Sequence, residues 1–174
     1  WGLQFVAGAK AWYWLGISTS NPDRIAVFKA AFAAPSPAEV LVLAFNASTA
    51  MLVVDEATDM VYYVRRTNTR AGRCAGGLGW GSVADDLVRA PFGSRAQDPE
   101  VVLEQPMGWC FGSGSVAYDS GRRRIYYTQL EMSSQFSKTS HLAALDIPAG
   151  TTHRMEWGLP RGTSHPLLRL SDDG

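Results

Sequence analysis

Residues 52–64 read Leu-Val-Val-Asp-Glu-Ala-Thr-Asp-Met-Val-Tyr-Tyr-Val, and residues 116–128 read Val-Ala-Tyr-Asp-Ser-Gly-Arg-Arg-Arg-Ile-Tyr-Tyr-Thr. Aligned without a gap, the two stretches place Asp55 on Asp119 and one pair of adjacent tyrosines on the other. Each stretch is an apolar run, a polar turn, and a β-branched and aromatic run, which is the pattern of a β-hairpin. The aspartate suits the turn, because its carboxylate can accept backbone N–H bonds two residues further on. The repeat predicts a chain built from similar hairpins.

The same frame occurs twice more. Residues 3–15 fit it, with Trp12-Tyr13-Trp14 at the aromatic end and Val6 in place of the aspartate, and a further copy starts at 166–174. A repeated hairpin of this kind is a supersecondary unit, so the fold has to be inferred from the repeat rather than from any single stretch.

A second hairpin is expected after each of the first three. The expected strand pairs are 24–28 with 40–45, 82–89 with 101–104, and 141–147 with 151–157. The first pair is expected to be joined through a loop at Pro35-Ser36-Pro37. Residues 82–89 have an alternative, because Ser82-x-x-Asp85 is also typical of a capping box that opens a short helix ending at Pro91.

Four strands in each unit of roughly 50 residues predict an all-β fold, a β-propeller segment of four-stranded antiparallel blades. About three blades plus the first strand of a fourth are expected: blade 1 at 1–48, blade 2 at 49–107 with a long Gly-rich insertion, blade 3 at 108–161, and the start of blade 4 at 162–174. Propellers close with about four to eight blades. We therefore expect either a segment of a longer propeller or several copies that assemble.

The repeated frame, apolar-x-apolar-Asp followed by five residues and then apolar-Tyr-Tyr or Trp, resembles the YWTD repeat of low-density-lipoprotein-receptor propellers. It resembles NHL repeats more loosely. Ile125-Tyr-Tyr-Thr-Gln129 is the closest copy, with Gln129 where that family carries Asp, whereas Tyr13-Trp14-Leu15-Gly16 keeps only the aromatic pair. The resemblance implies a propeller fold.

Composition and charge exclude several classes of protein. The 174 residues are 46% hydrophobic, and 16 basic side chains balance 16 acidic ones, so the formal net charge is zero. A neutral chain lacks the basic surface of a nucleic-acid-binding protein, so no nucleic-acid partner is expected. The longest uncharged run, residues 40–54, is shorter than the roughly 20 apolar residues that a membrane helix needs, so no membrane span is expected.

Two cysteines and a sequon suggest an extracellular setting. Cys74 and Cys110 lie in Gly-rich surroundings without a CxxC pair, which fits either a disulfide in an oxidising compartment or two free thiols. Asn46-Ala-Ser48 is a sequon in a predicted connection between blades, so Asn46 is a candidate for N-glycosylation.

Aromatic and basic residues in loops are the candidate partner contacts. Trp80 and Trp109 are expected in Gly-rich loops, where exposed aromatic rings often anchor sugars or proteins. Arg122, Arg123 and Arg124 follow a predicted turn and form either a solvated rim or a contact for an acidic partner. The aromatic residues on strands are expected to pack in the core: Trp12, Trp14, Tyr62, Tyr126 and Trp157.

No motif predicts catalysis, so no catalytic residue, metal site or cofactor is expected. A Gly-x-Ser-x-Gly elbow and a phosphate loop with its lysine are both missing, and Phe111-Gly-Ser-Gly-Ser115 is expected to be a flexible connection. The three histidines, His141, His153 and His165, recur every 12 residues. That spacing on antiparallel strands places neighbouring histidines at opposite ends of a sheet, so the three are not expected to bind one metal ion.

The sequence therefore favours a non-catalytic, extracellular or cell-surface propeller module of a larger glycoprotein. It would bind a protein or a glycan, or further copies or blades of its own kind, in adhesion or assembly. One alternative is a propeller hydrolase of the lactonase type, whose metal ligands would lie in other blades, because the matching loops here offer only Asn46, Gln105 and His165. The other alternative is the subunit of a self-assembling extracellular fibre.

Overall fold

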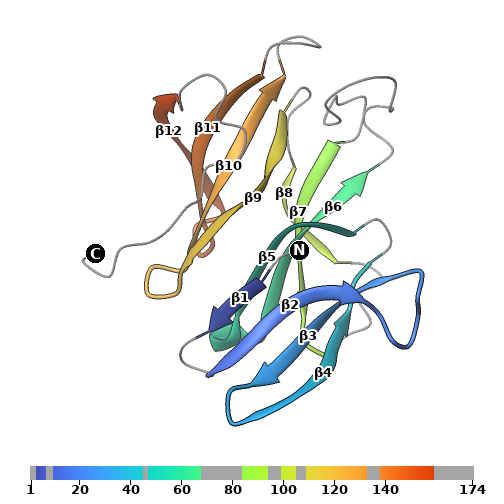
Figure 1. Ribbon diagram of the computed structural model, residues 1–174. Helices are drawn as coiled ribbons and strands as arrows, with labels where there is room; N and C mark the ends of the chain where they lie inside the picture. The colour runs from blue at the N-terminus through green and yellow to red at the C-terminus, as the bar shows by residue number, and fades with distance from the viewer. Residues whose placement is uncertain are drawn as a thin grey trace. The chain divides into compact units, whose positions relative to one another are not determined.

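Twelve β-strands run through the computed structural model, which describes residues 3–6, 10–44, 47–67, 84–93, 99–104, 109–132 and 138–158 (Figure 1). The strands form three sheets of four, and each sheet is made from consecutive strands paired mostly antiparallel. Across these ranges there is no α-helix, and the helical structure amounts to a 3-10 turn, η1 (Glu56–Thr58). The predicted all-β fold is confirmed.

The first sheet has the order β1-β2-β3-β4, with the bounds β1 (Leu3–Val6), β2 (Ala11–Ile17), β3 (Ile25–Ala31) and β4 (Ala34–Val42). The predicted loop at Pro35-Ser36-Pro37 is wrong, because these residues belong to β4 and the chain turns at Phe32–Ala33 instead. The strand tolerates both prolines because β4 is an outer strand of its sheet, and its register with β3 shifts between Lys29 and Ala31.

The second sheet has the order β5-β6-β7-β8, with the bounds β5 (Ala47–Asp55), β6 (Met60–Thr67), β7 (Ala84–Pro91) and β8 (Glu100–Glu104). The hairpin predicted from residues 52–64 forms, with Leu52 opposite Tyr63 and Val54 opposite Val61. The alternative of a helix opened by Ser82 is wrong, because residues 84–91 form β7. Leu87 and Val88 are both fully buried there, as on a strand that is covered on its two faces.

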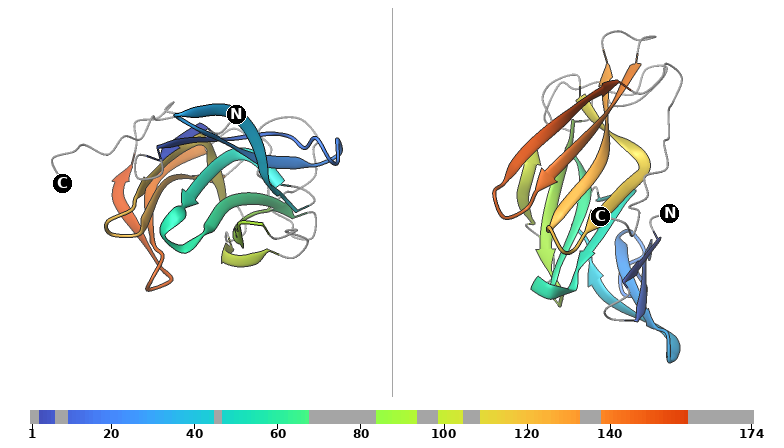
Figure 2. Two further views of the ribbon diagram at one scale, coloured as in Figure 1. Left: turned by 90° about the horizontal axis from the view of Figure 1, so that it is seen from below. Right: turned by 90° about the vertical axis from the view of Figure 1, so that its left-hand side faces the viewer.

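The third sheet has the order β12-β11-β10-β9, with the bounds β9 (Trp109–Asp119), β10 (Arg124–Met132), β11 (Lys138–Asp146) and β12 (Thr151–Gly158). These four strands stay side by side in both further views (Figure 2). Residues 111–115, predicted as a flexible connection, lie within β9. Their register against β10 shifts between Tyr127 and Gln129, so the Gly-rich stretch is accommodated as a bulge in the strand.

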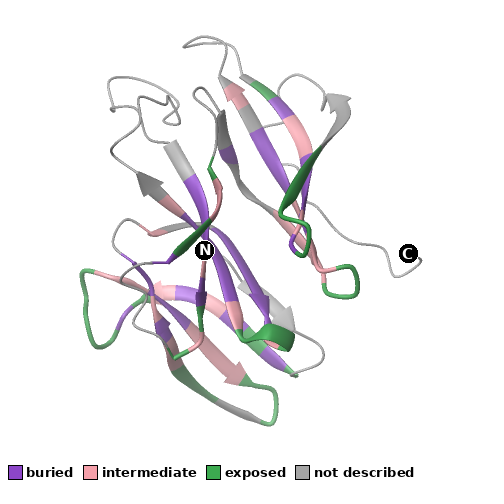
Figure 3. Cartoon of the chain, turned by 180° about the vertical axis from the view of Figure 1, so that it is seen from behind, coloured by how far each residue is buried: buried purple, intermediate pink, exposed green. Residues whose placement is uncertain are grey.

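The chain divides into two compact units, residues 1–65 with 87–103 and residues 66–86 with 104–174. In the first unit, buried residues of the first two sheets form one apolar cluster (Figure 3). The main members of the cluster are Ala11, Tyr13, Leu15, Val27, Leu41, Leu43, Leu52, Val54, Val61, Tyr63 and Val88. In the second unit, the buried residues of the third sheet include Phe111, Ile125, Tyr127, Ala143 and Leu145.

The aromatic residue of β2 that fills the core differs from the prediction. Tyr13 is only 1% exposed, whereas Trp12 is 39% exposed and Trp14 is half-buried. Alternate residues of a strand point to opposite faces, so burial of Tyr13 places both tryptophans on the other face, where Trp14 stacks on Phe28 at 5.7 Å between ring centroids.

For the tyrosine pairs of β6 and β10, the predicted core residue is correct in β6 and wrong in β10. Tyr62 is fully buried, as predicted. On β10, however, the fully buried residue is Tyr127, and the predicted core residue Tyr126 is only half-buried. In both β2 and β10 the actual core residue is thus the immediate neighbour of a residue that was expected there.

Candidate functional site

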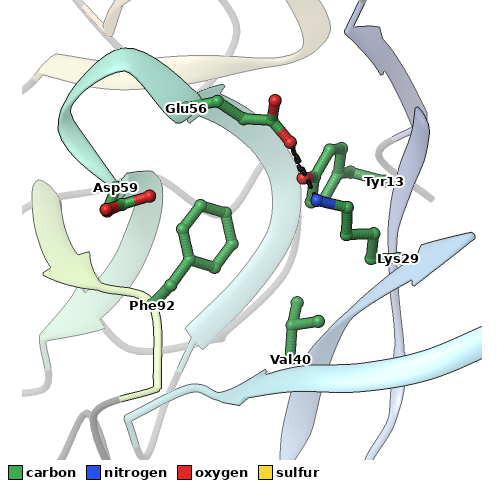
Figure 4. A pocket seen from close by; sticks show the side chains of 6 residues that line it. All are labelled: Tyr13, Lys29, Val40, Glu56, Asp59 and Phe92. Atoms are coloured by element: carbon green, nitrogen blue, oxygen red, sulfur yellow. Dashed lines mark hydrogen bonds and ion pairs between the residues drawn. The ribbon is translucent and has the colours of Figure 1, made fainter. Parts of the chain in front are cut away.

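A pocket of about 450 Å³ opens in the first unit, between elements of the first and second sheets (Figure 4). Its walls combine two aromatic rings, one aliphatic side chain, one ammonium and two carboxylates. The lining residues are Tyr13, Lys29, Val40, Glu56, Asp59 and Phe92. This volume lies within the range of small-ligand pockets, about 300–1,000 Å³.

One wall of the pocket comes from neighbouring strands of the first sheet. Tyr13 of β2 is directly opposite Lys29 of β3, so the two side chains lie on the same face of the sheet. The lysine interrupts an otherwise apolar strand, and its aliphatic stem can lie along that face while the ammonium reaches the pocket. Val40 of β4 completes this wall.

The opposite wall comes from the turn between β5 and β6. Glu56 begins η1, and Asp59 follows it with a left-handed backbone (φ 54°), a conformation that aspartate tolerates better than most residues. The Asp59 N–H donates to the Glu56 carbonyl at 3.4 Å, and the Asp59 carbonyl accepts a 2.9 Å bond from the Phe92 N–H. These bonds hold both acidic residues and Phe92 at the same edge of the pocket.

A single carboxylate oxygen joins the two walls. The Tyr13 hydroxyl donates a hydrogen bond to Glu56 Oε1, and Lys29 Nζ donates to the same oxygen at 3.1 Å. Lys29 Nζ also lies 5.1 Å from the centroid of the Tyr13 ring, within the range of a cation–π contact. The three side chains form one connected network (Figure 4).

The network keeps Tyr13 and Lys29 protonated at neutral pH. Burial, and secondarily the bond to Glu56, raises the pKa of Tyr13 to about 12. Contact with the Tyr13 hydroxyl, helped by Glu56, raises the pKa of Lys29 as well. At neutral pH the tyrosine is therefore a neutral hydrogen-bond donor and the lysine a cation.

The remaining wall is apolar and acidic. The Phe92 ring lies 5.9 Å from the Tyr13 ring, centroid to centroid, tilted by 37°. Asp59 is exposed, and no described residue donates a hydrogen bond to its carboxylate. With one ammonium and two carboxylates, the six lining side chains carry an excess of one negative charge.

The structure bears on only some of the residues that the sequence singled out. Asn46, Cys74 and Trp80 lie outside the described residues, as does the predicted start of a fourth blade at 162–174, so glycosylation and the disulfide stay predictions. Trp109 and Cys110 begin β9. The prediction that Trp109 lies in a loop is therefore wrong.

The three arginines lie at the turn between β9 and β10. Arg122 is exposed and pairs with Asp119 at 2.9 Å, while Arg124 pairs with Asp146 at 3.0 Å. Arg123 is half-buried and takes a left-handed backbone in the turn. Arg122 and Arg124 are thus both paired within the third sheet, and contact with an acidic partner stays a prediction.

Two of the three histidines are described, and both contact neighbours in the third sheet. His141 Nε2 lies 3.3 Å from Glu131 Oε2, and His153 Nε2 lies 3.4 Å from the Thr151 hydroxyl. His165 is not among the described residues. Within the described ranges, no three His, Cys, Asp or Glu side chains gather as a metal site would require. The same part of the chain contains no helix long and apolar enough to cross a bilayer.

No family model matches the chain, and no curated protein or solved structure does so either. The likeness to YWTD and NHL repeats therefore stays a prediction from the sequence.

Proposed function

We propose that the chain is made of β-propeller blades and serves as a non-catalytic binding module. Two observations support the propeller architecture. Each sheet contains four consecutive strands in sequential order, as a propeller blade does. The sequence also repeats one hairpin frame at the first two strands of each sheet. Together they favour stacked, equivalent units.

The observation that carries the binding function is the pocket between the first two sheets. It offers an aromatic ring, an aliphatic wall and a few converging polar groups, the combination that ligand sites generally use. Phe92 supplies the flat apolar surface, and Asp59 supplies hydrogen-bond acceptors that no described residue occupies. A partner side chain or a saccharide unit fits such a lining.

The polar network favours recognition over proton transfer. Glu56 Oε1 already accepts two hydrogen bonds, and a pKa of about 12 keeps the Tyr13 hydroxyl protonated. A general base works best when its pKa lies near the working pH, which the Tyr13 hydroxyl does not satisfy. The six lining residues also include no Ser, Cys or His, and the raised pKa values of Tyr13 and Lys29 keep both in their protonated, poorly nucleophilic forms.

An extracellular or cell-surface setting within a larger glycoprotein belongs to the same proposal. Its support is in the sequence, namely the sequon at Asn46 and the two cysteines, Cys74 and Cys110. A protein or glycan partner is the corresponding ligand class.

The binding function is tested by screening the full chain against immobilised glycans and peptides, with Phe92→Leu as the pocket variant. Phe32→Leu is the matched control, because Phe32 is 72% exposed at the turn between β3 and β4 and does not line the pocket. We expect ligands that bind the wild-type chain and the control but lose binding in the pocket variant. A screen in which every bound ligand ignores Phe92→Leu, in folded protein, would contradict the proposed site.

A further inference from the structure

The charge balance of the pocket indicates what it binds, an inference that rests on the proposed binding function. The positive charge of Lys29 is matched by Glu56, with which it forms a 3.1 Å ion pair. Asp59 then remains as a second carboxylate that no described side chain neutralises. The Glu56 Oε2 atom likewise accepts no hydrogen bond from a described residue. The carboxylate oxygens that accept no hydrogen bond from a described residue therefore favour a ligand whose hydrogen-bond donors carry positive charge.

The backbone of Asp59 is held in place, although its side chain is exposed. Its N–H and its carbonyl are both used in backbone bonds, to Glu56 and from Phe92. In Figure 4 the Asp59 side chain extends toward the Phe92 ring, with Tyr13, Lys29 and Glu56 on the other side of that ring. A group that stacks on Phe92 can thus reach Asp59 at the same time.

We propose that this pocket binds the guanidinium group of an arginine side chain presented by a partner protein. Asp59 would accept the two parallel N–H bonds that a guanidinium forms with a carboxylate, and Phe92 would stack on its flat face. A lysine ammonium fits this lining less well, because it is a compact point charge that cannot make a bidentate, stacked contact. A neutral saccharide could stack on Phe92, but it would leave the negative charge of Asp59 uncompensated.

Two probes of nearly equal shape show whether the positive charge of the ligand or its shape determines binding. Acetyl-arginine amide carries the guanidinium, and acetyl-citrulline amide replaces it with an uncharged urea. Each is titrated into the full chain, as is N-acetylglucosamine, and binding is followed by the amide NMR signals of Asp59, Phe92 and their neighbours. We expect the arginine probe to bind at least about tenfold more tightly than the citrulline probe, since the difference is one charge-assisted contact. Raised salt should narrow this difference.

Asp59→Asn is the decisive variant, because asparagine also accepts the left-handed backbone at this position. It should remove the preference for arginine over citrulline. Asp23→Asn is the matched control, an exposed carboxylate in the turn between β2 and β3 that should leave the preference unchanged.

The outcomes distinguish this inference from the proposed function. Equal affinity for the arginine and citrulline probes overturns the guanidinium assignment, as does tighter binding of the sugar at the same amides. In both cases the pocket remains a binding site. If no probe moves these amides and no ligand of the glycan and peptide screen depends on Phe92, the inference and the proposed function both fail.

Discussion

Tyr13 on β2 donates a hydrogen bond to Glu56, which begins the η1 turn after β5, and so connects the first sheet to the second. The tyrosine is almost completely buried, whereas Glu56 is half-buried and also pairs with Lys29. A hydrogen bond to a charged acceptor is stronger than one between neutral groups, and partial burial protects it from competing water. The bond therefore both stabilises the packing of the two sheets and joins the two walls of the pocket.

We predict that Tyr13→Phe lowers the free energy of unfolding by about 1.5–3 kcal/mol, the usual contribution of a hydrogen bond to a charged group. The ring and its packing are kept, so the loss reports the hydroxyl alone. Urea denaturation of the wild type, Tyr13→Phe, Glu56→Gln and the double variant gives the coupling of the pair. The two single effects should fail to add by about 0.5 kcal/mol or more. Simple additivity would show that the two residues act independently.

Alkaline pH is expected to weaken the first unit through the same tyrosine. In the unfolded chain Tyr13 ionises at its ordinary pKa of 10.0, but the folded protein holds the proton up to a pKa of about 12. Its stabilising effect is thus fully present below pH 10 and is lost between these two values, because unfolding then releases a proton. A phenolate absorbance titration should show one tyrosine fewer ionising near pH 12 in Tyr13→Phe than in the wild type. Identical titration curves would contradict this assignment.

Local patterns in the sequence were enough to predict the hairpin of residues 52–64, although they misplaced the turn between β3 and β4. The stretch 52–64 consists of an apolar run, a polar turn with an aspartate, and a second run of apolar and aromatic residues, and the predicted pairing forms in β5 and β6. Local pattern was not enough to predict which face of β2 is buried. Trp12 and Tyr13 are both large and aromatic, so hydrophobicity gives no preference, and a shift of one residue exchanges the two faces of a strand. Packing against β5, which is distant in sequence, determines which face of β2 is buried.

The candidate site could not be predicted for a similar reason. Its residues come from β2, β3, β4, the turn after β5 and the segment after β7, and only the packing of two sheets brings them together. Lys29 within an apolar strand was the one local signal, since a charge at a half-buried strand position usually has a partner. No pattern in the sequence around Lys29 indicates that Glu56 is that partner.

Glu39 is predicted to hold the turn between β2 and β3. Its carboxylate accepts hydrogen bonds from the Thr19 N–H at 2.6 Å and from the hydroxyls of Ser18, Thr19 and Ser20 at 2.9–3.1 Å. Glu39→Gln turns one acceptor oxygen into a donor, so about 1 kcal/mol of stability should be lost at neutral pH. The measurement is urea denaturation, with Asp23→Asn in the same turn as the control. An effect no larger than that of the control would show that the hydroxyls are equally well bonded to water.

The same carboxylate makes the turn sensitive to acid. Burial alone would raise its pKa, but the bonds from Thr19, Ser20 and Ser18 outweigh burial and hold the pKa below the ordinary value of 4.5. A lowered pKa in the folded state means that the stabilisation is complete above pH 4.5 and is lost as the pH falls through the folded value. Glu39→Gln should therefore remove part of the acid dependence of unfolding. If the wild type and the variant lose stability in parallel below this pH, the assignment is wrong.

Gly16 is predicted to be essential for the aromatic face of the first sheet. A Cβ added there would lie 2.9 Å from Cε2 and 3.2 Å from Cδ2 of the Phe28 ring, closer than such atoms approach. The ring cannot move freely, because its other neighbour is Trp14, stacked on it at an interplanar angle of 16°. Gly16→Ala should cost about 1–3 kcal/mol, the usual penalty of overpacking, which exceeds the gain of up to about 1 kcal/mol from replacing a strand glycine.

Gly121→Ala is the matched control for this substitution, because its added Cβ would meet only Asp119 Oδ1 at an ordinary 3.4 Å. Combining Gly16→Ala with Phe28→Leu should cost less than the sum of the two single changes, since the smaller side chain leaves room for the methyl group. Thermal and urea unfolding of the four variants measure this directly. If Gly16→Ala is as stable as Gly121→Ala, the Phe28 ring can move aside without a measurable loss of stability. The stacking of Trp14 on Phe28 would then not restrict the residue at position 16.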